Sequence, residues 1–414
     1  MDGTFLKRLR GRDRLLRVCR CAMRRRTRLS TWLSTHLFLT KLMDLTRTVY
    51  GTWSGGRFMH FGEVLDEGRF IGAIQLAYES GIRTFMSADV YGSGKADELL
   101  GVALRGIERG TYCLVGTLGH DFYAGVRDGS KGYPRFTDPA LHGPEGYADF
   151  LTMAAEKSVA RCGADYFDLV MLHNPDERGY TSDAVWEAMR GLKTQGLTRQ
   201  LGIAPGPANG FTYDLIQCFE KYCELIDWAM IILNPLEPWP GSLVLPAADE
   251  FGVKLLTRVV DYGGLFHGEM KAGHTFRPGD HRNYRPAGWI ERGLEKIERM
   301  RPIAERHGLS MIQFASLWNL AHGPVESVVP TFIQEAGENA RPIEDQIRDL
   351  AALPNENPFT SEEVAEIARI GDNTGCMTLK GASRRHETSD RPDEWAMRDD
   401  LAPLAARWGL ESIQ

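Results

Sequence analysis

Four side chains that can exchange protons stand at or just after the ends of predicted strands. They are the phenol of Tyr91, the imidazoles of His120 and His173, and the carboxylate of Asp121. Groups of these types act as general acids and bases when they meet in one cleft. Each also has an ordinary structural explanation, as a packing tyrosine, a buried histidine or a polar loop residue. Their chemistry therefore depends on whether the fold brings them together.

Other polar residues near strand ends are further candidates. Asp89 lies two residues before Tyr91, and Asp261 and Tyr262 follow the seventh predicted strand. The basic segment 277–285 could hold an anionic substrate or a cofactor phosphate, or it could be a solvated loop. No group of His, Cys, Asp and Glu has the spacing of a metal site, so we expect no metal.

Apolar, β-branched runs alternate with longer amphipathic segments from residue 48 onward, a pattern typical of repeated β-α-β units. The continuous apolar runs fit strands that are buried on both faces. The predicted strands cover residues 48–53, 83–88, 112–118, 167–173, 198–204, 228–234, 253–260 and 327–332. The predicted helices cover residues 67–79, 95–104, 147–161, 182–194, 213–225, 289–306 and 310–320. This pattern predicts an α/β fold, the (β/α)8 TIM barrel, whose active sites lie at the C-terminal ends of the strands.

An open, doubly wound sheet is the alternative fold, but no G-x-G-x-x-G motif follows any predicted strand. Two connections are much longer than turns: residues 119–146 after strand 3 and residues 261–289 after strand 7. Both contain many Gly, Pro and aromatic residues, and both leave strand ends where barrel enzymes build their sites. We expect these long loops to close over a pocket.

The length of 414 residues suits one large barrel with insertions, and a charged fraction of 25% is ordinary for a globular protein. Residues 1–42 carry 12 Lys and Arg against 2 Asp and Glu. We therefore expect a basic, disordered extension over 1–42, followed by a barrel over 43–414 with a C-terminal helical tail. The formal net charge of the whole chain is −6, which gives the barrel no general attraction for nucleic acid.

The seven cysteines are scattered, without the spacing of a zinc site or of a dense disulfide framework, which favours a reducing compartment. No apolar run reaches the ~18 residues that a membrane span requires. We therefore expect a cytoplasmic protein with a small-molecule substrate and no membrane partner. The sequence indicates no oligomeric state.

Several motifs occur in an order that resembles the aldo/keto reductase family. They are V-Y-G-T-W-S-G-G at 49–56, G-I-R-T-F-M-S-A-D-V-Y-G-S-G-K at 81–95, F-D-L-V-M-L-H-N-P-D at 167–176, G-I-A-P at 202–205, N-P-L at 234–236 and G-L-S-M-I-Q-F-A-S-L-W at 308–318. The resemblance covers most of the chain, from about residue 48 to residue 371. It implies a barrel that reduces carbonyl compounds with a nicotinamide cofactor and no metal.

The family's chemistry uses four cooperating groups, and this chain keeps two of them. A tyrosine hydroxyl donates a proton to the carbonyl oxygen, a histidine orients the carbonyl, and a lysine paired with an aspartate assists the tyrosine. The resemblance gives the first two roles to Tyr91 and His173. Met86 stands in the place of the aspartate, and we expect Leu118 to stand in the place of the lysine. His120 and Asp121, beside Leu118, could replace the missing pair.

The positions that the resemblance implies for NADP(H) are also altered. The family commonly has Ser-Asn after strand five to hold the nicotinamide amide, where this chain has Ala204 and Pro205. Asn234 follows strand six and is a further candidate contact. After strand eight, Arg341 and Gln346 could take the roles of the arginine and glutamine near the adenine, at shifted spacing.

The resulting hypothesis is an enzyme similar to aldo/keto reductases that acts with NADP(H) on a small carbonyl or hydroxyl compound. One alternative is a non-redox enzyme, such as a lyase or isomerase, in which the four proton-exchanging groups work on the same scaffold. Another is a cofactor-binding module without turnover, because a fold does not fix a function.

Overall fold

The computed structural model describes residues 44–129, 132–206, 211–285, 287–373 and 402–410. Eight parallel strands form one sheet in sequence order, each hydrogen-bonded to the next. The strands are β1 (Val49–Gly51), β2 (Thr84–Ala88), β3 (Cys113–Leu118), β4 (Phe167–His173), β5 (Thr198–Ala204), β6 (Trp228–Ile232), β7 (Lys254–Arg258) and β8 (Val325–Val329). Thr48 pairs with Val328 next to β1, so the sheet closes on itself. The predicted (β/α)8 TIM barrel is confirmed.

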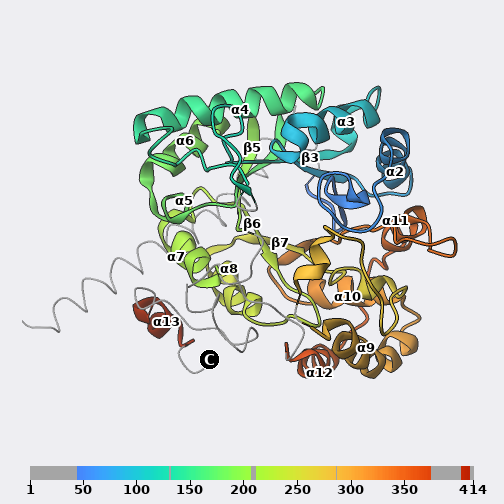
Figure 1. The fold of residues 1–414 in the computed structure, drawn as a ribbon. Coiled ribbons are helices and arrows are strands. Elements are labelled where there is room, and N and C mark those ends of the chain that lie inside the picture. Colours follow the sequence, from blue (N-terminus) through green and yellow to red (C-terminus); the bar gives the residue numbers. More distant parts are fainter. Residues whose placement is uncertain (1–43, 130–131, 207–210, 286, 374–401, 411–414) are drawn as a thin grey trace, which may run out of the picture.

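Helices surround the strands on all sides, as Figure 1 shows. They are α2 (Glu67–Glu79), α3 (Lys95–Ala103), α4 (Tyr147–Arg161), α5 (Glu177–Thr181), α6 (Asp183–Thr194), α7 (Thr212–Tyr222), α8 (Leu245–Phe251), α9 (Trp289–Arg306), α10 (Met311–Leu320), α11 (Ile343–Ala351), α12 (Ser361–Gly371) and α13 (Ala402–Trp408). The sequence indicates several of their starts: Ser310 and Gln313 form a capping box at α10, and the side chain of Asp66 caps α2.

Side chains of each strand alternate between two buried layers, because successive residues of a strand point to opposite faces. On β3, Cys113 and Val115 belong to the inner cluster that fills the barrel, whereas Leu114 and Leu118 belong to the outer cluster between strands and helices. The same alternation places Thr117 on the inner face. Leu118, which we expected in the place of the family's lysine, therefore faces the outer cluster, and Thr117 is the inward residue near the end of β3.

Strand β8 begins two residues earlier than predicted and ends at Val329. The predicted strand continued to Phe332, but the backbone N–H groups there bond to side chains instead of to a neighbouring strand. The N–H of Thr331 donates to Asp261 at 2.8 Å, and that of Phe332 donates to Ser54 at 3.0 Å. Buried backbone groups need partners, so these side chains end the strand without loss of hydrogen bonding.

The long loops predicted after strands 3 and 7 are present. A buried ion cluster anchors the loop after β7, since Arg282, at 1% exposure, contacts both Asp280 and Glu335. Asp280 also accepts a hydrogen bond of 2.8 Å from the backbone of Gly62, in the loop after β1. Because Glu335 follows β8, the cluster joins the loops that follow three strands.

After the barrel strands and α11, the described residues form α12 and α13. Helix α13 is fastened to α7 through Glu220, which binds Arg407 at 2.5 Å and Trp408 at 3.0 Å. The predicted basic extension over 1–42 lies outside the described residues. Within the described ranges, no helix combines the length and the apolar composition needed to cross a bilayer.

Candidate functional site

Tyr91 and His173 meet at the C-terminal end of the barrel. Tyr91 follows β2 at the start of a tight turn in which Gly92 and Ser93 both have positive φ. A Cβ at Gly92 would lie 2.7 Å from the ring of Phe58, so the turn also depends on glycine's small size. The rings of Tyr91 and His173 pack edge to face, with centroids 5.9 Å apart. The structure thus brings together the two residues expected to contact a substrate.

His173 is the last residue of β4 and lies on its inner face, in register with Ala204 of β5. Its side chain is 5% exposed, and its buried Nδ1 has no hydrogen-bond partner among the described residues. Burial, followed by the charges of His120, Arg135 and Arg258, lowers the pKa of His173 well below its usual value. The ring is therefore neutral at physiological pH.

His120 lies against His173, with ring centroids 5.0 Å apart. The backbone of β3 can approach β4 this closely because residue 119 is glycine. A Cβ on Gly119 would lie 2.5 Å from the carbonyl oxygen of His173. Nη1 of Arg135 lies 2.8 Å from Nδ1 of His120, and Nδ2 of Asn174 lies 3.1 Å from Nε2. Burial and then Arg135 lower the pKa of His120 to about 3, so this ring is neutral too.

Asp121 does not join this group, although it follows His120 directly. One carboxylate oxygen accepts a hydrogen bond of 2.8 Å from His142, and the other accepts the backbone N–H groups of Tyr123 and Ala124. Both oxygens are thereby used to shape the loop after β3. The expected pairing of His120 with Asp121 as an acid/base couple does not occur in this structure.

The family's charged pair is replaced by uncharged side chains. Met86, on the inner face of β2, is buried in the inner cluster that Tyr91 packs against. Thr117, the inward residue near the end of β3, donates its hydroxyl to the carbonyl oxygen of Ser87 at 3.1 Å. Neither group can stabilise a phenolate, so any positive charge near Tyr91 must come from another strand.

Arg258 supplies that charge, and our sequence analysis missed it. It is the last residue of β7, in register with Ile232 of β6 and Val329 of β8. Leu256, two residues earlier, belongs to the inner cluster, so Arg258 also faces the barrel interior. The alternation of the strand T-R-V-V could have revealed an inward arginine at this position.

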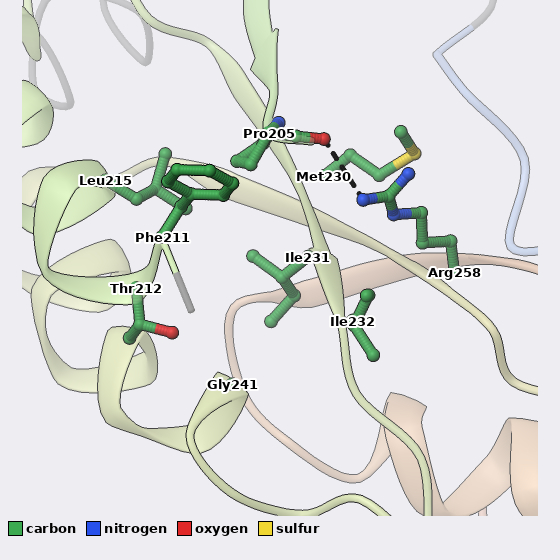
Figure 2. Close-up of a pocket in the computed structure, with 9 residues that line it drawn as sticks. All are labelled: Pro205, Phe211, Thr212, Leu215, Met230, Ile231, Ile232, Gly241 and Arg258. Carbon is green, nitrogen blue, oxygen red and sulfur yellow. Dashed lines mark hydrogen bonds between the residues drawn. The ribbon is translucent and has the colours of Figure 1, made fainter. Parts of the chain in front are cut away.

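The guanidinium of Arg258 is held by backbone carbonyl groups (Figure 2). Its Nη2 donates to the carbonyl oxygen of Pro205 at 3.0 Å and to that of Gly206. Nε is buried and has no partner among the described residues. The side chain lines a shallow recess whose other walls are formed by Pro205, Phe211, Thr212, Leu215, Met230, Ile231, Ile232 and Gly241. The recess is therefore mostly apolar with one cation.

The phenol of Tyr91 is a weak acid in this setting. Burial raises the pKa of Tyr91 to about 12, and the charge of Arg258 opposes that rise. A neutral phenol at physiological pH can donate a proton to an oxygen atom beside it. Arg258 is the charged group positioned to stabilise the phenolate that such a transfer leaves.

The other acidic candidates have structural surroundings. Neither oxygen of Asp89 has a hydrogen-bond partner among the described side chains, and burial followed by Asp97 raises the pKa of Asp89 well above its usual value. Asp261 accepts backbone N–H groups of Gly264 and Thr331, and so fixes the start of the loop after β7.

The residues expected to hold the nicotinamide end of a cofactor offer little to it. Ala204 is fully buried in the inner cluster, and Pro205 has no side-chain donor. Asn234 is also fully buried: its Oδ1 accepts the N–H groups of Leu236 and Glu237, and its Nδ2 donates to Glu237 at 2.9 Å. Asn234 thus forms a turn, which differs from the cofactor contact that we expected.

The side chains of Gln346 and Arg341, expected near the adenine, also make contacts within the protein. Gln346 is fully buried, and its amide binds the backbone of Ile333 on both sides and Glu269 at 2.9 Å. Arg341 is paired with Asp349 at 3.3 Å. The buried amide of Gln346 is fully engaged within the protein, whereas Arg341 is paired but partly exposed.

Carboxylates also surround the start of α11, where a phosphate would need positive or N–H groups. Glu344 occupies the first turn of the helix and binds Arg69 at 2.8 Å, and Glu269 accepts the N–H of Arg341. The arginines near this helix start are each paired with a carboxylate, Arg69 with Glu344 and Arg341 with Asp349, an arrangement that does not favour the 2′-phosphate of NADP(H).

No group of three or more His, Cys, Asp and Glu side chains is arranged to hold a metal ion anywhere in the described ranges. The proton-exchanging cluster consists of Tyr91, His120 and His173, with Arg135 and Arg258 nearby. The cluster can orient an oxygen atom, donate a proton to it and stabilise the negative charge left behind.

Comparison with known proteins agrees with this architecture. A probable voltage-gated potassium channel subunit beta from Arabidopsis thaliana is 23% identical over 327 residues, covering 76% of this chain and 92% of that protein. The structure of a glycerol dehydrogenase from Gluconobacter oxydans superposes with a TM-score of 0.63 at 23% identity, covering 83% of this chain and 98% of the other.

A third similar protein is an aldo/keto reductase from Klebsiella pneumoniae, solved in complex with NADP and acetate. It superposes with a TM-score of 0.51 at 20% identity, covering 78% of this chain and 90% of the other. The model of the aldo/keto reductase family matches residues 48–372, the whole barrel and α12. This chain belongs to the aldo/keto reductase family.

Proposed function

We propose that this protein is an oxidoreductase that reduces or oxidises a small carbonyl or hydroxyl compound with a nicotinamide cofactor, in the cytoplasm. The observation that carries the proposal is the contact between Tyr91 and His173 at the C-terminal end of the barrel strands, with centroids 5.9 Å apart. Barrel enzymes place their reacting groups at this end. Family membership supports the class of reaction.

The chain's own residues handle the proton. The hydroxyl of Tyr91, neutral at physiological pH, donates its proton to the substrate oxygen as negative charge develops there. The neutral ring of His173 orients that oxygen by a hydrogen bond. Arg258 stabilises the phenolate form of Tyr91 after the transfer, a task that a lysine performs in the family.

The cofactor would supply the hydride when bound. NADP and NADPH occur in the Klebsiella relatives, and this supports a nicotinamide cofactor here. Because carboxylates line the start of α11, we propose that NADH binds this chain at least as tightly as NADPH. NADPH carries an extra phosphate that would meet those carboxylates.

A second candidate function is a non-redox acid/base enzyme or a module without turnover. The observation that favours it is the loss of side-chain donors at the cofactor positions, where Ala204 and Pro205 stand and where Asn234 and Gln346 are occupied. The proton-exchanging cluster itself serves either function equally well.

Titration of the full-length chain with NADH and with NADPH distinguishes these functions. We expect quenching of tryptophan emission that saturates below the millimolar range, and cofactor consumption with at least one aldehyde. Absence of saturation with both cofactors would remove the redox function and favour the acid/base alternative. Saturation without consumption across a panel of carbonyl compounds would favour the module without turnover.

A further inference from the structure

Two guanidinium groups stand close to His173 without an acidic partner. Neither Arg135 nor Arg258 has a carboxylate within 4.0 Å in the part of the chain that the structure describes, whereas Arg282 and Arg341 do. Both cations are near enough to His173 to lower the pKa of its ring. Partly buried charges without counter-ions are unusual, because removing a cation from water costs free energy unless an anion compensates it.

Arg135 reaches the site from the loop after β3. Its Nε donates to the carbonyl oxygen of Asn174, and its Nη1 contacts Nδ1 of His120 and the carbonyl oxygen of Tyr133. Its Nη2 has no hydrogen bond within the described ranges. The side chain is partly exposed, so a ligand at the barrel mouth can reach it.

Arg258 reaches the site from β7 and contacts the segment that follows β5, the strand paired with β4 of His173. Carbonyl oxygens of Pro205 and Gly206 occupy its Nη2 and fix the plane of the guanidinium. Its Nη1 has no hydrogen bond to any described residue, and the side chain is partly exposed along the recess. Within the described protein, Nη2 of Arg135 and both Nε and Nη1 of Arg258 therefore remain without a hydrogen-bond acceptor.

The neighbouring acidic groups are used elsewhere. Asp121 binds His142, and Asp176 accepts the hydroxyl of Thr137 at 2.7 Å and the N–H of Gly179 at 3.0 Å. Asp261 accepts two backbone N–H groups. None of these carboxylates lies within 4.0 Å of Arg135 or Arg258 in the described ranges, so no direct ion pair occupies either guanidinium.

We propose that Arg135 and Arg258 bind a carboxylate of the substrate, so that the protein acts on small carbonyl or hydroxyl compounds that also carry a carboxylate. The carbonyl or hydroxyl part of this statement rests on the proposed function, whereas the carboxylate part rests on the two arginines. Guanidinium groups bind planar carboxylates through paired N–H donors, and each charged hydrogen bond is stronger than a neutral one. The apolar walls of Met230 and Ile232 would contact the carbon chain of such a substrate.

Binding of simple probes tests this proposal without any turnover. The full-length chain is titrated by calorimetry with succinate, with the neutral analogue 1,4-butanediol and with inorganic phosphate. We expect succinate to bind and butanediol not to bind. We expect Arg135→Met and Arg258→Met each to weaken succinate binding by about tenfold or more, because each removes one charged contact.

Two further variants separate loss of the site from loss of the fold. Arg258→Lys keeps the charge but not the planar guanidinium, so it should bind succinate more tightly than Arg258→Met and more weakly than the natural chain. Arg127→Met removes an exposed arginine from the same loop as Arg135 and should leave the affinity unchanged. Retained far-ultraviolet circular dichroism in all variants shows that they are folded.

Equal heats with succinate and butanediol would overturn the proposal, as would unchanged succinate affinity in both Met variants. Tighter binding of phosphate than of succinate would also overturn it and would assign the cations to a phosphate. The redox proposal is tested separately by the NADH and NADPH titrations. Turnover of neutral aldehydes at the rate of succinic semialdehyde would leave that function intact and contradict only the carboxylate.

Discussion

The acidity of one phenol determines what this site can do. Tyr91 has lost both members of the charged pair that the family places beside it, and burial among apolar side chains raises its pKa. Replacing a buried ion pair by apolar groups costs a fold little or nothing. Loss of the charged pair should affect proton transfer more than the fold, because the acidity of Tyr91 depends on a nearby cation. Arg258, at the end of β7, is the cation whose charge favours the phenolate of Tyr91.

Removing that cation should make Tyr91 a still weaker acid. With 3-nitrotyrosine incorporated at position 91, the phenol titrates in an accessible pH range and its absorbance reports its pKa. We expect Arg258→Met to raise this pKa, because the positive charge that favours the phenolate is lost. Arg285→Met, which removes an arginine stacked on Tyr262 and Trp289, is the control. Identical titrations in all three proteins would show that Arg258 does not act on Tyr91.

The buried histidines should make the protein sensitive to acid. The pKa of His120 is about 3 in the folded chain against an ordinary value of 6.5, so below pH 6.5 the unfolded chain takes up a proton that the folded chain does not. The contribution of His120 should lower the free energy of unfolding by up to about 1.4 kcal/mol per pH unit as the pH drops from 6.5 toward 3. Above pH 6.5, His120 should have no effect on the pH dependence of that free energy.

Urea unfolding between pH 4.5 and pH 7.5 measures this effect. His120→Gln should show a shallower loss of stability than the natural chain below pH 6.5, while His173 continues to contribute its own loss. His60→Gln, in which an exposed ring is removed, serves as the control. A variant whose stability falls as steeply as that of the natural chain would contradict the buried, neutral state of His120.

At the scale of elements, the direction of each strand residue decides its role. The order of strands and most helix positions follow from the sequence, because buried parallel strands read as apolar runs and helices as amphipathic ones. The ends of β3 and β7 could not be placed by this pattern alone. Leu118 and Thr117 are adjacent, and only the alternation fixed by Cys113 and Val115 shows which one faces inward.

Residues with internal partners were the hardest to predict. Asn234 and Gln346 stand near the positions that a cofactor would need, yet their amides satisfy backbone groups of nearby turns. Nothing in the local sequence separates an amide that binds a ligand from one that binds the backbone. We missed Arg258 for a different reason. We treated the predicted strand 253–260 as a buried apolar strand and did not work out which of its side chains face the barrel interior.

The direction of β3 can be tested by restoring the family's pair. Met86→Asp with Thr117→Lys places both new charges on inner faces at neighbouring strands, since Met86 and Thr117 lie on β2 and β3 on the same side. Met86→Asp with Leu118→Lys instead buries an ammonium in the outer cluster. We expect the second variant to be less stable than the first by about 3 kcal/mol or more in urea unfolding, because its charge is unpaired.

Equal stability of the two double variants, or the reverse order, would show that Leu118 rather than Thr117 faces the barrel interior. Turnover gives a second measurement. If the proposed function is correct, only the variant with Thr117→Lys should react faster than the natural chain, because its ammonium can lower the pKa of Tyr91.

At the scale of the whole molecule, the loops after β1, β7 and β8 are tied together by one buried cluster. Arg282 binds Asp280 and Glu335, and Asp280 binds the backbone of Gly62. Arg282 also lies over the ring of Phe276, with its Cζ 4.1 Å from the ring centroid. Each partner is buried, so the cluster stabilises the folded loops only while it is complete.

Breaking this cluster should destabilise the protein strongly. Arg282→Met leaves two buried carboxylates without their cation, and we expect a loss of about 3–5 kcal/mol in the free energy of unfolding. Arg277→Met removes a more exposed pair, 3.8 Å from Glu63, and should cost less than about 1 kcal/mol. Similar losses in the two variants would show that the buried cluster stabilises the protein no more than an exposed ion pair does.

The buried cluster of Arg282, Asp280 and Glu335 also limits which loops can move when a ligand approaches Tyr91. One half of the rim, formed by the segments after β1, β7 and β8, cannot spread apart without leaving Asp280 and Glu335 unpaired in an apolar interior. A ligand that has to displace a loop to reach Tyr91 would therefore meet less resistance at the loop after β3, which carries Arg135 and has no part in this cluster.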